Sequence, residues 1–103
     1  MQQTDKTIAL TILQQLGGNK FRAMTGMKHG IALPDGLSFR LPSGFARNGI
    51  NYVKITLTPM DDYDMEFMSI RGLKVKSINS MTGIYADMLQ SIFTNETGLD
   101  THL

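Results

Sequence analysis

The stretch INYVKITLTPMDDYDMEFMSIRGLKVKSI, residues 50–78, decides the fold because it contains three successive strand-like segments. These segments cover residues 50–57, 63–70 and 73–78. In the first of them, Val53 and Ile55 alternate with Tyr52 and Lys54, and such alternation is typical of a strand with one buried face. The short connections between the segments predict an antiparallel meander.

The first loop of this meander sets the register of its first two strands. A five-residue loop over 58–62 places Ile55 opposite Met65 and Lys54 opposite Glu66. Apolar side chains then face each other on one side of the sheet, and opposite charges face each other on the other side. The residues Asp61 and Asp62 within this loop are typical of turns.

The second loop has two possible lengths. A two-residue turn at 71–72 would place Phe67 opposite Lys76, which sets a core residue against a charge. A three-residue loop over 70–72, with Gly72 in the left-handed bulge position, places Phe67 opposite Val75 and Glu66 opposite Lys76. We therefore expect the longer loop, and with it a Lys54–Glu66–Lys76 ladder on the water-facing side.

Two more strand-like segments precede the meander. They are KFRAMT, residues 20–25, and LSFRL, residues 37–41. Leu37 and Phe39 alternate with polar residues, and the sequence Pro34-Asp35-Gly36 before them is a turn signal. We expect the segment between these two strands to be a long loop.

Helical patterns flank the five strands. Ile8, Ile12 and Leu16 recur at helical spacing after a possible N-cap at Thr4, and Gly17 and Gly18 end this pattern, so we expect a helix over 5–16. A second helix is expected to begin at Ser80 or Thr82 and to end at Gly98. Its apolar stripe comprises Ile84, Tyr85, Met88, Leu89, Ile92 and Phe93.

These elements predict an α+β fold in a single domain over residues 1–103. A helix, a five-stranded antiparallel sheet and a second helix favour a two-layer sandwich with both helices on one face of the sheet. The other face would remain in water, as antiparallel sheets allow.

The composition excludes several classes of function. The chain has 103 residues, a net charge of +1 and no cysteine, so neither a thiolate metal site nor a cysteine nucleophile is possible. No apolar run is long enough to cross a membrane, and the first residues lack the pattern of a signal peptide. We expect a cytoplasmic protein that does not act at a membrane.

The segment LGGNKFRAMTGMKHG, residues 16–30, combines paired glycines with basic side chains and raises the question of a phosphate-binding loop. In such a loop the glycines precede a helix, because the free N–H groups at the helix N-terminus hold the phosphate. Gly17 and Gly18 instead follow the first expected helix. We interpret this segment as the seam between a helix and a strand.

Catalytic and metal-binding patterns are weak. The two histidines, His29 and His102, have no further ligand at a suitable spacing. Asp61, Asp62 and Asp64 lack the glycine and the distal glutamate of a calcium loop. We expect a protein that is not an enzyme and that carries no metal and no cofactor.

Several stretches resemble a small, widely scattered protein family that is met in phage, prophage and other mobile-element regions of bacterial genomes. They are ILQQLGGNKFRAMTG, GLSFRLP, NGINYVKITLTP, YDMEF, IRGLKV and GIYADMLQSIFTNETGL, and together they cover nearly the whole chain. The family has no established activity, so no site residue carries over. The resemblance implies an accessory role in a mobile element or its host.

Two surfaces are candidates for binding. The outer face of the sheet is expected to gather cations and one aromatic side chain, with only Asp64 and Glu66 in opposition, and such a face can bind single-stranded nucleic acid through phosphate contacts and base stacking. These residues are Lys20, Arg22, Arg40, Tyr52, Lys54, Lys74 and Lys76. A plain solvated face with cations that protect its edges is the alternative.

The second candidate is a protein-interaction surface. Met27, Ile31, Leu33 and Phe45 are apolar residues in segments expected to be loops, and such side chains commonly form partner sites. An edge strand could also pair with a second copy and give a homodimer. We expect a non-enzymatic accessory protein that acts through protein–protein interaction, with single-stranded nucleic-acid binding as the alternative.

Overall fold

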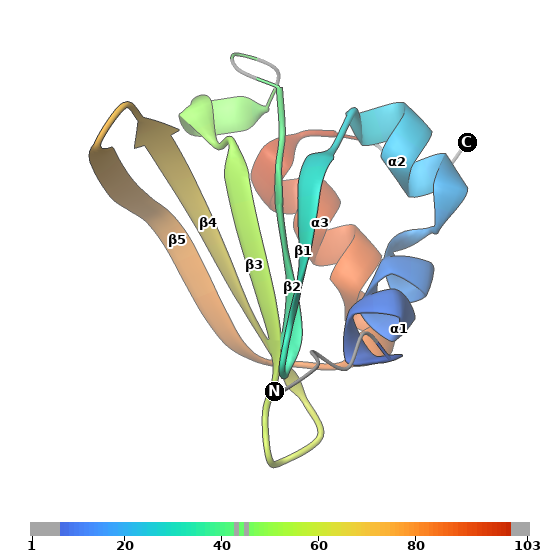
Figure 1. Ribbon diagram of the computed structural model, residues 1–103. Coiled ribbons are helices and arrows are strands. Elements are labelled where there is room, and N and C mark those ends of the chain that lie inside the picture. Colours follow the sequence, from blue (N-terminus) through green and yellow to red (C-terminus); the bar gives the residue numbers. More distant parts are fainter. Residues whose placement is uncertain (1–6, 43, 45, 100–103) are drawn as a thin grey trace, which may run out of the picture.

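The computed structural model describes residues 7–42, 44 and 46–99, and it forms a five-stranded antiparallel sheet with three α-helices (Figure 1). The strands follow one another in the sheet in the order β1-β2-β3-β4-β5. The elements are α1 (Thr7–Leu16), α2 (Asn19–Thr25), β1 (Lys28–Leu33), β2 (Gly36–Arg40), η1 (Arg47–Gly49), β3 (Tyr52–Leu57), β4 (Tyr63–Arg71), β5 (Lys74–Ile84), η2 (Ala86–Met88) and α3 (Leu89–Thr97). The predicted α+β class and the five-stranded antiparallel sheet are confirmed, and Figure 1 shows the helices on one side of the sheet.

The pairing of β3 with β4 confirms the expected register. Ile55 lies opposite Met65, and Lys54 lies opposite Glu66. The loop over 58–62 is closed by the backbone, since the N–H of Thr58 donates to the carbonyl of Asp62 at 2.8 Å. Asp61 has a positive φ of 64°, a conformation that suits turn residues such as aspartate.

The pairing of β4 with β5 contradicts the expected register. Arg71 lies opposite Lys74, so the turn has two residues, Gly72 and Leu73. Gly72 has a φ of 60° whereas Leu73 has no positive φ, which is the pattern of a type II′ turn. The three-residue loop over 70–72 is therefore wrong.

A bulge shifts the pairing of β4 with β5 farther from the turn, where the turn alone would place Phe67 opposite Ile78. The register shifts between Phe67 and Met68, so that Phe67 faces Asn79 and the Nδ2 of Asn79 donates to the Oε1 of Glu96 at 2.7 Å. Glu66 faces Ser80, so the Lys54–Glu66 pair is present but Lys76 does not extend it. The extra residue is Ile78 of β5, whereas the core side of β4 is set by its pairing with β3.

The segment 20–25, expected to be a strand, is helix α2. Phe21 and Thr25 are both buried and lie one helical turn apart, and the Oγ1 of Thr25 donates to the carbonyl of Phe21 at 2.7 Å. The first strand is instead β1, which lies where a long loop was expected. Its pairing with β2 is irregular near His29, whose φ is 54°.

The paired glycines end α1 as expected. The N–H of Gly18 donates to the carbonyl of Leu13 at 2.9 Å, and the N–H of Gly17 donates to the carbonyl of Gln14 at 3.1 Å. This is the Schellman pattern, and it leaves neither N–H free for a phosphate. The seam interpretation holds with one correction, because the glycines join two helices and not a helix and a strand. The proposed N-cap Thr4 lies outside the described residues.

The C-terminal helix is shorter than expected at its start. Ser80, Thr82 and Ile84 belong to β5, and α3 begins only at Leu89. Its end is confirmed, since Gly98 adopts the left-handed conformation after the last turn with a φ of 76°.

The core lies between the sheet and the helices. The rings of Phe21 and Phe93 meet edge to face with centroids 4.9 Å apart, and Phe39 contacts Phe21 at 5.5 Å. Strand residues such as Val53 and Phe67 are fully buried against them. The positions of β3 and β4 that face away from this core form the outer face of the sheet.

Candidate nucleic-acid interface

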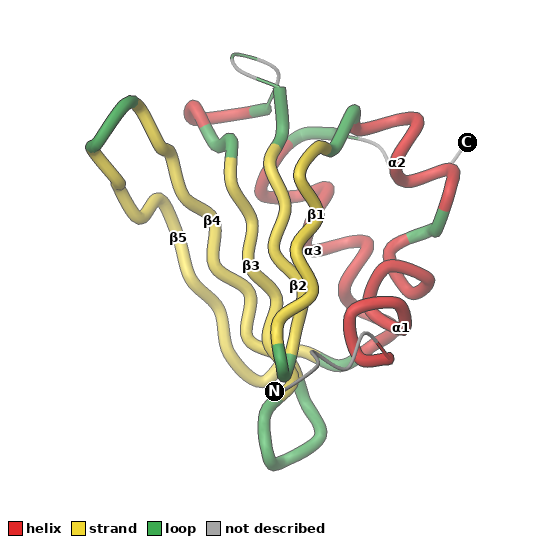
Figure 2. Tube along the Cα trace, in the orientation of Figure 1, coloured by secondary structure: helices red, strands yellow, loops and turns green. Residues whose placement is uncertain are grey.

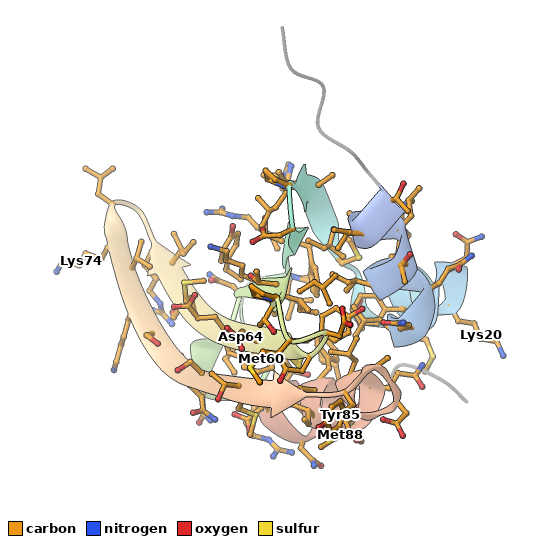
Figure 3. The ribbon with its side chains drawn as sticks, turned by 90° about the horizontal axis from the view of Figure 1, so that it is seen from below. Lys20, Met60, Asp64, Lys74, Tyr85 and Met88 are labelled. Atoms are coloured by element: carbon orange, nitrogen blue, oxygen red, sulfur yellow. The ribbon has the colours of Figure 1, made fainter. Side chains whose placement is uncertain are left out.

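The structure divides the seven predicted nucleic-acid residues among three places. Lys20 and Arg22 are exposed on helix α2, so the sheet does not carry them. Figure 3 shows Lys20 and Lys74 on opposite sides of the molecule. The expectation that these side chains share one face is wrong for both residues of α2, because the segment 20–25 is a helix.

Arg40, Tyr52 and Lys54 lie on the outer face as predicted. Arg40 is opposite Tyr52 across β2 and β3, and Lys28 of β1 lies opposite Arg40. Residues that face each other on neighbouring strands project from the same side of a sheet, so Lys28, Arg40 and Tyr52 form one row.

Lys74 and Lys76 lie on the other face of the sheet. Lys76 is opposite Ser69 and Lys74 is opposite Arg71. Alternate residues of a strand share a face, so both lysines project on the side of buried Phe67. Val75 is opposite Ile70 and projects on the outer face, away from Val53 and Phe67, which also contradicts the expected arrangement.

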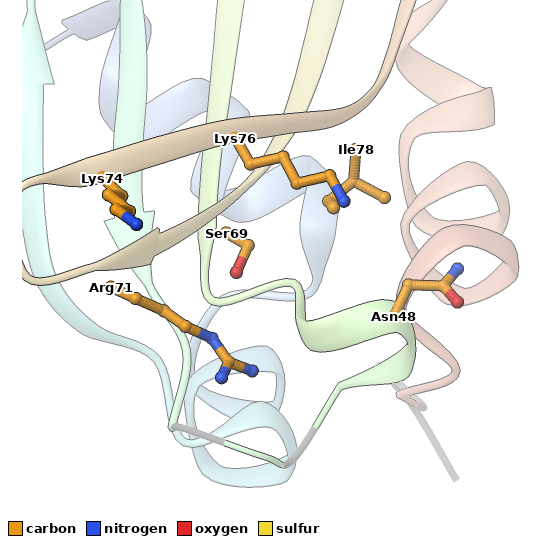
Figure 4. Close-up of a pocket in the computed structure, with 6 residues that line it drawn as sticks. All are labelled: Asn48, Ser69, Arg71, Lys74, Lys76 and Ile78. Atoms are coloured by element: carbon orange, nitrogen blue, oxygen red, sulfur yellow. The ribbon is translucent and has the colours of Figure 1, made fainter.

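These cations surround a hollow beside the helices (Figure 4). Its volume is about 300 Å³, and none of the six described residues that line it is acidic. They are Asn48, Ser69, Arg71, Lys74, Lys76 and Ile78, and we call this the cationic hollow. The strands β4 and β5 supply five of its residues, and η1 supplies Asn48.

The segment η1 closes one side of the cationic hollow. Asn48 and Gly49 both have a positive φ, of 59° and 73°. A Cβ atom at Gly49 would lie 3.6 Å from a terminal nitrogen of Arg71. Arg47 is held elsewhere, since its Nη1 donates to the carbonyl of Asn95 at 3.2 Å, near the C-terminus of α3.

Charges of opposite sign collect at opposite ends of the sheet. In an antiparallel meander the starts of β1, β3 and β5 meet the ends of β2 and β4 at one edge, which lies at the top of Figure 1. This basic end carries Lys28, Arg40, Arg47, Arg71, Lys74 and Lys76. The opposite end carries Asp35, Asp61, Asp62, Asp64 and Asp87. The net charge of +1 therefore conceals a strong separation of charge.

The basic end places like charges directly against each other. Arg71 faces Lys74, and Lys28 faces Arg40. Like charges opposite each other destabilise a sheet, so these pairs do not contribute to folding. No carboxylate forms an ion pair with a cation of the cationic hollow within the described part of the chain. The arrangement suits an anion with several charges.

A second hollow lies at the same end of the sheet. It is lined by Lys28, His29, Arg40, Leu41, Pro42, Asn51 and Ile70. Lys28, Arg40 and His29 are exposed there. Lys28 and Arg40 project on the outer face, so the two hollows lie on opposite faces at the basic end of the sheet.

Sequence reasoning missed Arg71, Asn48 and Lys28. Arg71 falls in the expected loop, although Gly72 is a signal for a two-residue turn that begins with glycine. Lys28 was assigned to a loop because β1 lacks an alternating pattern. Asn48 has no sequence signal beyond its place before a glycine.

The predicted protein-interaction residues are also dispersed. Ile31 and Leu33 lie in strand β1 and not in a loop, and Ile31 is 52% exposed. Both face outer-face residues of β2, Ser38 and Gly36. Met27 packs partly against the core, and Phe45 lies outside the described residues.

The described residues show no group of three or more metal-ligating side chains that could hold a metal ion. The carboxylate of Asp62 accepts a short hydrogen bond from the hydroxyl of Thr58 within its own loop. His29 is exposed on β1, and His102 lies outside the described part. No described helix is long and apolar enough to cross a membrane.

Comparison with known proteins gives no relative for this chain. No protein-family model, no curated protein and no solved structure matches it.

Proposed function

We propose that the protein binds nucleic acid through the basic end of its sheet. The observation that carries this proposal is the cationic hollow, where Arg71, Lys74 and Lys76 gather without a carboxylate among the described lining residues. The pairing of Arg71 with Lys74 is unfavourable for folding, so a polyanionic ligand would relieve a repulsion that the free protein contains.

The chemistry of the hollow suits phosphate groups. The planar guanidinium of Arg71 can bind two phosphate oxygens at once, and the ammonium groups of Lys74 and Lys76 act as point charges. The side chains of Asn48 and Ser69 offer neutral donors beside them. Contacts of this kind bind the backbone of a nucleic acid without selecting a sequence.

The dimensions of the basic end suit a run of phosphates. From β1 to β5 there are four inter-strand spacings of about 4.8 Å, so the end extends about 19 Å along the sheet. Successive phosphates on one strand of a duplex lie about 3.4 Å apart along its axis, so this length matches roughly five or six of them. Lys28 and Arg40 project on the opposite face at the same end, so a nucleic acid that wraps around the end of the sheet would reach them.

A titration of fluorescently labelled DNA, single-stranded and double-stranded, tests the proposal. We expect binding in low salt with an affinity that falls steeply as salt rises, because each phosphate contact releases counterions. Absence of binding to both forms at low salt and high micromolar protein would refute the proposal. Binding that does not respond to salt would also refute it, because phosphate contacts require that response.

Protein–protein interaction is the second candidate, and the exposure of Ile31 on an edge strand favours it. Strand β1 has one unpaired edge, and Ile31 and Leu33 lie on the outer face beside it. A second copy or another protein could add a strand there. Light scattering tests self-association: a dimer that Ile31→Lys converts to a monomer supports it, and a strict monomer at high concentration excludes it.

Either binding activity is compatible with a non-enzymatic accessory role in a phage or another mobile element, which the sequence resemblance implies. The two candidates use different surfaces. Substitutions in the cationic hollow and on β1 therefore separate them.

A further inference from the structure

The tip of the β4–β5 hairpin carries an apolar side chain that the fold does not use. Leu73 has a relative exposure of 103%, the largest among the exposed large hydrophobic residues of the described chain. A two-residue turn that begins with glycine is commonly completed by asparagine, aspartate or serine. Neither the turn nor the core therefore requires a leucine at this position.

The hairpin projects from the body of the protein. All residues from 71 to 77 are exposed, and Val75 on the outer face is 63% exposed. Figure 2 shows the turn between β4 and β5 at the corner of the sheet that lies farthest from α1, α2 and α3. The tip is thus accessible to a large ligand.

Cations flank the apolar tip. Arg71 and Lys74 form the last cross-strand pair before the turn, and Lys76 follows on the same face. Leu73 lies in the turn next to two cations that share one face of the hairpin, and a base step in DNA places an apolar stack next to charged phosphates. Proteins that bend DNA insert apolar side chains, leucine among them, into such steps.

We propose that Leu73 inserts between neighbouring base pairs of duplex DNA while Arg71 and Lys74 contact neighbouring phosphates. This inference rests on the proposed nucleic-acid binding and names duplex DNA as its ligand. Proteins that bind single strands stack the bases on aromatic rings, and the hairpin tip carries none. An aliphatic side chain unstacks a step and kinks the duplex instead.

The test uses a DNA duplex with 2-aminopurine at a central step and a fluorophore at each end. Binding of the wild-type protein should raise 2-aminopurine fluorescence by about twofold or more and bring the two ends closer, because the wedge unstacks and bends the step. Leu73→Ala should abolish both signals and leave the salt dependence of binding unchanged, since the phosphate contacts remain. Leu10→Ala is the matched control, because Leu10 is an exposed leucine of α1 and should retain both signals.

The outcomes separate this inference from the proposed function. Salt-dependent duplex binding with no fluorescence change, or with a change that Leu73→Ala retains, overturns the wedge and leaves nucleic-acid binding intact. Binding to single strands without binding to the duplex also overturns the wedge and leaves nucleic-acid binding intact. Absence of binding to both DNA forms overturns both proposals. Leu73-dependent binding to vesicles of phosphatidylcholine and phosphatidylserine, without duplex binding, overturns the wedge in favour of a membrane contact.

Discussion

The side chain of Asn51 pairs with both backbone groups of Ile70. Its Nδ2 donates to the carbonyl of Ile70 at 2.8 Å, and its Oδ1 accepts from the N–H of Ile70 at 2.8 Å. Asn51 precedes strand β3, so its amide continues the pairing of β3 with β4 beyond the end of the ladder. This contact supports β4 directly before Arg71 and the hairpin turn.

Replacing Asn51 with alanine should lower the free energy of unfolding by about 1–3 kcal/mol, because both partly buried groups of Ile70 lose their partner. Urea unfolding measures this change. Asn95→Ala is the control, since Asn95 is exposed on helix α3 and alanine favours a helix. Equal urea midpoints for the Asn51 variant and the wild type would show that the amide does not stabilise the hairpin.

Replacing Gly72 with valine should destabilise the protein by about 1 kcal/mol or more, because a β-branched residue disfavours a positive φ. No atom lies within 4 Å of a Cβ placed on Gly72, so the effect would report backbone strain alone. Leu73→Val is the control, since it places the same side chain at the next turn position without a positive φ. A wild-type urea midpoint for the Gly72 variant would mean that the turn differs from the one described.

Replacing Ser38 with alanine should stabilise the protein by about 0.5–1 kcal/mol, because a buried hydroxyl without a partner costs free energy. The Oγ of Ser38 is buried and has no hydrogen-bond partner, and the residue is 1% exposed between β1 and β3. Ser77→Ala, at an exposed position of β5, should change the stability little. A decrease in thermal stability of the Ser38 variant would reveal a bond that this hydroxyl makes.

The central strands were predictable from local pattern because their two faces differ. In β3, buried Val53 and Ile55 alternate with water-facing side chains, and a loop of unambiguous length leads to β4. The segment around Phe21 was ambiguous, since Phe21 and Thr25 fit both a strand of period two and a single helical turn. Both residues are buried against the core in the helix. This packing selects the helix, and the local sequence pattern carries no information about it.

The prediction for Lys74 and Lys76 was wrong because of a single turn. The turn lies at residues 72–73 and not at 70–72, which shifts the pairing of β5 against β4 by three residues. A shift by an odd number of residues moves Lys74 and Lys76 to the other face of the sheet. The bulge that places Asn79 opposite Phe67 has no sequence signal, because β5 is polar on both faces around Asn79. Their charge was sufficient to predict Lys74 and Lys76 as binding residues. Only the observed register of β4 and β5 shows that Arg71 lies beside them.

The most direct test of the account compares two triple variants that remove the same charge. One replaces Arg71, Lys74 and Lys76 with glutamine, and the other replaces Lys20, Arg22 and Lys54 with glutamine. All six side chains are exposed, so both variants should fold, as circular dichroism can verify. DNA affinity is then measured by fluorescence anisotropy over a range of salt concentrations.

We expect the first variant to lose affinity by about tenfold or more at low salt and its salt slope to fall by about 2 to 3, because three phosphate contacts disappear. The second variant should retain the wild-type slope. Equal losses for the two variants would show that only net charge matters and would contradict a binding site at the basic end of the sheet.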